Sequence, residues 1–174
     1  MKNLLLLFFI SLHISAISQT SQNITLVLPS IALMDIAPNN AVFNLNLAAP
    51  TEAGNSIINT TTNSTKWINF TSAVAPGITR RITAQVSGTP PNGINLKLLT
   101  LNYAGGGAGA LGNSSGTVYL TGTAQVLVNT IGGAYTGDGS NNGYNLNYSL
   151  EISNYSLLKG QTNTFLIIYT MLDN

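Results

Sequence analysis

NLNYSLEI, residues 145–152, places the apolar side chains of Leu146, Tyr148, Leu150 and Ile152 at every second position. Because side chains alternate across a β-strand, this spacing puts all four on one face. The stretch TFLIIYTML, residues 164–172, is apolar on both faces and indicates a strand buried between neighbours or under another subunit. No long helical pattern accompanies these stretches, so the sequence predicts an all-β protein.

Further short segments combine apolar residues with turn residues at their ends, which is typical of strands in a sandwich. They lie at residues 23–28, 31–36, 41–47, 66–70, 79–86, 94–103, 117–120 and 123–128. The polar stretch 59–65 is expected to be a loop or edge segment, and Trp67 to anchor the core. This pattern predicts an immunoglobulin-like antiparallel β-sandwich, with a jelly roll as the alternative.

The first eighteen residues have the features of a secretory signal peptide. Lys2 precedes the apolar run LLLLFFI at residues 4–10, and the small residues Ala16 and Ser18 follow at the expected cleavage site. The apolar run is too short to cross a bilayer as a helix. We therefore expect a secreted or cell-surface protein without a transmembrane span. Its parts are a signal peptide at 1–18, an N-terminal extension or first strand at 19–36, and a β-sandwich domain at 37–174.

The composition argues against an enzyme. The only histidine, His13, lies in the expected signal peptide, no cysteine is present, and the chain has only five acidic residues. Acid–base, nucleophilic and transition-metal sites are built mainly from these residue types. Without Lys2, five basic residues balance the five acidic ones, which is too little positive charge for nucleic-acid binding. We expect no catalytic residues, no cofactor and no nucleic-acid partner.

DGSNNG, residues 138–143, matches the first half of a calcium-binding loop, and Asp138, Ser140 and Asn142 would be its ligands. The acidic residue expected at the twelfth position is missing, because Ser149 stands there. A plain turn is therefore favoured over a cation site.

Two other groups of residues have more than one interpretation. Adjacent arginines, Arg80 and Arg81, point to opposite faces of a predicted strand, so we expect one to be solvated and the other to cover an edge or pair with Glu52 or Glu151. Seven tyrosines are either core residues or a binding surface for glycans or peptides. Exposure of Tyr135 and Tyr144 in one groove beside Asp138 would favour the second interpretation.

Both ends of the expected mature chain are suited to strand pairing between molecules. The segment 19–28 has no charged side chain and carries Ile24, Leu26 and Leu28 at alternate positions. Such a segment can add a strand to the sheet of another protein. The terminal strand, with Phe165, Ile167 and Tyr169 on one face, would border the groove that accepts it.

This layout resembles that of bacterial fimbrial and spore-coat-U-type subunits. Gly160, fourteen residues before the C-terminus, and Tyr169 in the last strand are similar to the terminal pattern of chaperone–usher pilins. Tyr169 is not the penultimate residue, and the disulfide common in those pilins is absent. The resemblance implies an exported immunoglobulin-like subunit in which Ile24, Leu26 and Leu28 are the donor-strand positions.

From these observations we expect a non-catalytic structural or adhesive subunit of a cell surface that assembles by β-strand addition. Its partners would be further copies of itself or other surface subunits, and the resemblance adds a periplasmic chaperone. The alternative is a monomeric secreted module that binds glycans or peptides.

Overall fold

The computed structural model describes residues 18–59 and 61–174, so the expected signal peptide lies outside the described residues except for Ser18. The regular secondary structure of the described chain is almost entirely β, with one short 3-10 helix at Tyr155–Leu157. The strands are β1 (Ile31–Ala37), β2 (Leu47–Ala48), β3 (Ile58–Asn59), β4 (Thr62–Ala73), β5 (Arg80–Ser87), β6 (Ile94–Thr100), β7 (Ala108–Gly109), β8 (Asn113–Ser114), β9 (Thr117–Leu120), β10 (Gln125–Ile131), β11 (Ala134–Tyr135), β12 (Tyr144–Ile152) and β13 (Leu166–Asp173).

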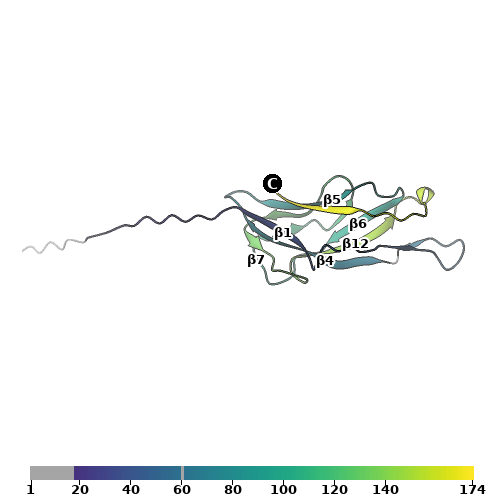
Figure 1. Ribbon diagram of the computed structural model, residues 1–174, viewed down its shortest axis with the longest axis horizontal. Helices are drawn as coiled ribbons and strands as arrows, with labels where there is room; N and C mark the ends of the chain where they lie inside the picture. The colour runs from purple at the N-terminus through teal and green to yellow at the C-terminus, as the bar shows by residue number, and fades with distance from the viewer. Residues whose placement is uncertain (1–17, 60) are drawn as a thin grey trace, which may run out of the picture.

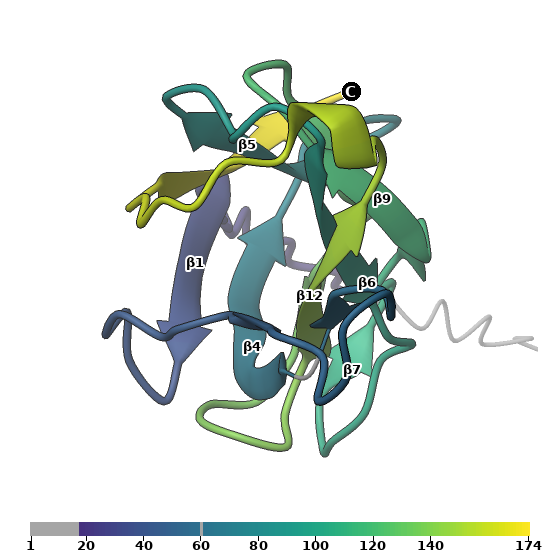
Figure 2. The same ribbon diagram turned by 90° about the vertical axis from the view of Figure 1, so that its right-hand side faces the viewer.

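Two antiparallel sheets pack face to face (Figures 1 and 2). The larger sheet has the order β7-β11-β4-β12-β6-β9, and β1 also pairs with β4. The smaller sheet has the order β13-β5-β10-β8, and β2 and β3 form a separate hairpin. The predicted antiparallel β-sandwich is thereby confirmed.

The twelve-residue strand β4 organises the larger sheet. It pairs with β1 from Ile31 opposite Ala73 to Ala37 opposite Trp67, and with β12 and β11 as well. It begins at Thr62, so the sequence 59–65, which we expected to be a loop or edge segment, largely forms the start of this strand. The Thr and Asn side chains there tolerate exposure, and the ladder with β12 satisfies the backbone.

The core lies between the two sheets. Alternate residues of each long strand point inward and are buried, namely Ile68 and Phe70 of β4, Ile82, Ala84 and Val86 of β5, Leu96 and Leu98 of β6, and Leu146 and Tyr148 of β12. The prediction for Trp67 is wrong, because it lies between the inward residues Lys66 and Ile68 and is only partly buried, outside the core cluster.

Two predicted strands are not paired as expected. The segment 23–28 lies outside every sheet, and strand pairing in the predicted segment 41–47 is confined to Leu47 in β2. The predicted segment 31–36 agrees closely with β1, which pairs with β4, so these residues belong to the sandwich.

We predict that Ile68→Ala destabilises the sandwich strongly, because Ile68 has no exposed surface and lies at the centre of β4. The expected loss is about 2–5 kcal/mol of unfolding free energy, measured by urea denaturation. Val42→Ala is the control: Val42 is 84% exposed, and the change should cost less than about 0.5 kcal/mol. Equal losses for the two variants would contradict the proposed position of the core.

Candidate assembly surface

Residues 18–30, which we call the N-terminal tail, project from one end of the sandwich without entering a sheet (Figure 1). The predicted donor-strand residues are among the most exposed apolar side chains: Ile24 is 87%, Leu26 92% and Leu28 77% exposed. Val27, on the other side of the alternation, is also exposed. The tail thus leaves four large apolar side chains in solvent.

The terminal strand β13 forms one edge of the smaller sheet and pairs only with β5 among the described strands. On its inward face, Ile167 and Tyr169 pack against the core, as does Phe165 just before the strand, yet all three remain partly exposed. On the outward face, Leu166 is 65% and Ile168 37% exposed. One side of this strand therefore has free backbone groups beside an incompletely covered apolar interior.

The other edge on this side of the molecule is β1, which contacts β13 but forms no ladder with it. β1 stands beside β4, with which it pairs over its whole length (Figure 2). Leu33, on β1, is 64% exposed and was not among the predicted assembly residues. The only feature of the sequence that could have indicated its exposure is the interrupted alternation of IALMDI, residues 31–36.

The two edge strands meet at the guanidinium of Arg80. Its Nε donates to Asp173 Oδ1 at the end of β13 at 2.7 Å. Nη2 donates to Ser30 Oγ at 2.7 Å, and Nη1 donates to the carbonyl oxygens of Ile31 and Ala73. Arg80 thus holds the point where the tail leaves the domain.

The two arginines differ as expected, one buried and one with its hydrogen bond at the surface, but the acid that pairs with Arg80 is neither Glu52 nor Glu151. Arg80 is buried and pairs with Asp173, whereas Glu151 accepts a hydrogen bond from the Tyr119 hydroxyl at 2.7 Å. Arg81 reaches Asn174 Oδ1 at 2.9 Å on the surface. Pairing of β13 with β5 brings Asp173 opposite Arg80, a contact between residues far apart in the chain that strand periodicity alone does not reveal.

The structure places the predicted calcium ligands in a loop fastened by amide side chains. Asn142 Nδ2 donates to the Asp138 carbonyl oxygen at 2.7 Å, and its Oδ1 accepts from the Gly106 amide at 3.3 Å. Asn69 holds the same loop from β4, donating to the Asn142 carbonyl at 2.6 Å. The Asn142 side chain therefore joins two loops, while Ser140 is exposed. The preference for a plain turn over a cation site stays a prediction.

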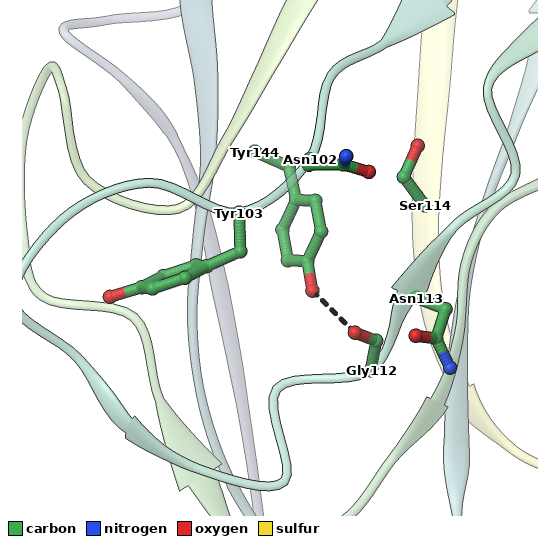
Figure 3. A pocket seen from close by; sticks show the side chains of 6 residues that line it. All are labelled: Asn102, Tyr103, Gly112, Asn113, Ser114 and Tyr144. Atoms are coloured by element: carbon green, nitrogen blue, oxygen red, sulfur yellow. Dashed lines mark hydrogen bonds between the residues drawn. The ribbon is translucent and has the colours of Figure 1, made fainter.

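Tyr135 and Tyr144 are not exposed together, the arrangement that would have favoured a binding surface. Tyr135 is 51% exposed, whereas Tyr144 is 1% exposed and its hydroxyl donates to the carbonyl oxygens of Leu111 and Gly112. Tyr144 forms the inner wall of a surface pocket of about 410 Å³ (Figure 3). This pocket is lined by neutral residues: Asn102, Tyr103, Gly112, Asn113, Ser114 and Tyr144.

Tyr148 of β12 and Tyr169 of β13 join the two sheets through their hydroxyl groups. Burial raises the pKa of both, and for Tyr148 the repulsion from Tyr169 adds to the rise. Burial raises the pKa of Tyr169 from 10.0 to about 12, although its hydrogen bond to Tyr148 acts in the opposite direction. The neutral form of this pair is therefore favoured in the folded protein.

Within residues 18–59 and 61–174, no three His, Asp or Glu side chains are grouped as a metal-ligand set. No helix in this part of the chain is long and apolar enough to cross a membrane. No protein-family model, curated protein or solved structure matches the chain.

We predict that stability falls in alkaline solution. Between pH 10 and pH 12, a tyrosine whose pKa is raised by folding keeps its proton in the folded protein but loses it in the unfolded chain. Its contribution to the free energy of unfolding is therefore complete below pH 10 and declines toward pH 12. Urea denaturation at increasing pH should show this decline. The double variant Tyr148→Phe with Tyr169→Phe should lose less stability as the pH rises. Some decline should persist, because burial also raises the pKa of Tyr144 to about 12. An unchanged slope in the double variant would contradict the assignment.

We also predict that Arg80→Met destabilises the protein by about 2–4 kcal/mol, because partly buried acceptors from β1 and β4 lose a charged donor. Arg81→Met, which removes a surface hydrogen bond, is the matched control and should cost less than about 1 kcal/mol. Urea denaturation measures both, and equal effects would argue against Arg80 as the link between the edges.

Proposed function

We propose that this protein is a non-catalytic structural or adhesive subunit of a cell surface, and that its copies assemble by β-strand addition. The observation that carries the proposal is the combination, in one chain, of an exposed alternating tail and a free sheet edge on β13. The export signal suggested by residues 1–18 supports a secreted or cell-surface location.

The tail has the length and chemistry of an added strand. Thirteen extended residues span about 43 Å, whereas the eight residues of β13 span about 26 Å. The tail has no charged side chain, so pairing would bury no unpaired charge. Its Ile24, Leu26 and Leu28 lie on one face of an extended strand and can cover the interior beside Ile167 and Tyr169.

The tail cannot reach this interior in the conformation described, because it runs outward from the point that Arg80 holds. A strand supplied by a neighbouring copy meets no such restriction. Backbone hydrogen bonds to β13 would give affinity, and the alternate apolar side chains would give register. Other surface subunits with a similar tail, and a chaperone that covers β13 before assembly, are further partners of this proposal.

The proposal predicts that Ile24→Ser, Leu26→Ser and Leu28→Ser together abolish assembly. Light scattering and negative-stain electron microscopy of the exported chain should show oligomers or filaments for the unmodified protein and monomers for the triple variant. Val27→Ser is the matched control, because Val27 is 80% exposed and lies on the opposite face. This control should form the same oligomers or filaments as the unmodified protein.

A stable monomer of the unmodified chain at high concentration would overturn the proposal. It would favour the alternative of a monomeric glycan- or peptide-binding module, for which the neutral pocket beside Tyr144 is the place to search (Figure 3).

A further inference from the structure

Residues 41–46, which we call the unpaired segment, fill part of the core without belonging to a sheet. Phe43 and Leu45 pack against the core cluster, whereas Val42 between β1 and Phe43 is 84% exposed. Among the described residues, the backbone of positions 42–45 takes part in no hydrogen bond. Figure 2 shows the chain after β1 crossing the near end of the sandwich, in front of β4 and β12.

Only a few contacts hold the unpaired segment. Its Phe43 ring lies against Tyr148, with ring centroids 4.8 Å apart. Two residues before the segment, the backbone oxygen of Asn39 accepts a hydrogen bond from Lys66 Nζ at 2.8 Å. At its last residue, the backbone of Asn46 forms hydrogen bonds with Thr61 Oγ1. The segment is thus held by two apolar side chains and its two ends.

One side chain, Tyr148, connects the Phe43 ring to the free edge strand. Tyr148, on which this ring rests, meets the hydroxyl of Tyr169 on β13. Phe43 and the inward face of β13 therefore contact the same core residue, Tyr148. A strand added to β13 from outside would direct its own alternate side chains toward this part of the core.

The N-terminal tail repeats the pattern of the unpaired segment. ITLVL at 24–28 has apolar residues at the first, third and fifth positions, and so has FNLNL at 43–47. Both stretches are uncharged. Two segments of one chain thus offer the same spacing of apolar side chains, one inside the core and one in solvent.

We propose that the unpaired segment is a placeholder, which the N-terminal tail of a second copy displaces on assembly. This inference rests on the proposed function and names the state of the acceptor before assembly. The tail is favoured in the exchange because it supplies apolar side chains at the same spacing and, in addition, pairs with the free backbone groups of β13. The unpaired segment leaves those groups without a strand partner.

The placeholder also keeps the single molecule soluble until assembly. While Phe43 and Leu45 remain in place, they cover apolar surface of the core that would otherwise face solvent. A tail can bind only the fraction of molecules in which the segment has moved aside, so the apparent affinity falls by that fraction.

A labelled synthetic peptide of residues 19–30 tests this inference. The acceptor is the full chain carrying Ile24→Ser, Leu26→Ser and Leu28→Ser, so that its own tail does not compete. Fluorescence anisotropy measures peptide binding, and hydrogen–deuterium exchange follows the amides of residues 41–46. We expect exchange in this segment to rise when the peptide binds. Adding Phe43→Ser and Leu45→Ser to the acceptor should tighten binding by about tenfold or more.

Val42→Ser in the same acceptor is the matched control and should leave binding unchanged, because Val42 lies outside the core. The exchange measurement needs no change in the unpaired segment, so it decides the question even if Phe43→Ser with Leu45→Ser unfolds. Binding without faster exchange at 41–46 would overturn the placeholder and leave strand addition intact. Absence of binding to every acceptor would overturn both.

Discussion

The guanidinium of Arg80 is the contact on which the arrangement of the edges depends. One planar group donates to β1, to β4 and to the end of β13, and so ties the two sheets together where the tail departs. A guanidinium can satisfy several acceptors in fixed directions at once, which an ammonium group does less well. Strands β1 and β13 are joined here without a ladder between them, and the interior beside β13 stays partly uncovered beyond this point.

An uncovered edge is a hazard for a soluble sandwich, and charged side chains are a common protection. This chain uses few, since charged residues are 6% of the sequence. On β13 the outward side chains Leu166 and Ile168 are apolar, and Asp173 is used by Arg80. An edge without repelling charge is suited to controlled pairing, and the unpaired segment with Phe43 provides a cover made of the chain itself.

Much of the fold was predictable from local patterns. Strict alternation in residues 145–152 and the turn residues between short apolar segments indicated an antiparallel sandwich, and β12 and β13 lie close to their predicted positions. The alternation of Ile24, Leu26 and Leu28 in an uncharged segment was likewise visible in the sequence, whereas its position outside every sheet was not. Failures occurred where a residue's role depends on distant partners. Trp67 was assigned to the core and residues 41–47 to a regular strand, and Asp173 was not among the acids considered for the arginines.

The sequence by itself determined the periodicity, and with it which side chains share a face, because alternation is a local property of an extended backbone. It also determined the shortage of histidine, cysteine and acidic residues. Only the tertiary structure decided which strands are neighbours. Pairing of β5 with β13 places Asp173 beside Arg80, and departure of the chain from the sheet after β1 sends Phe43 into the core without a ladder. Both outcomes depend on contacts between distant residues, whose energies no local pattern contains.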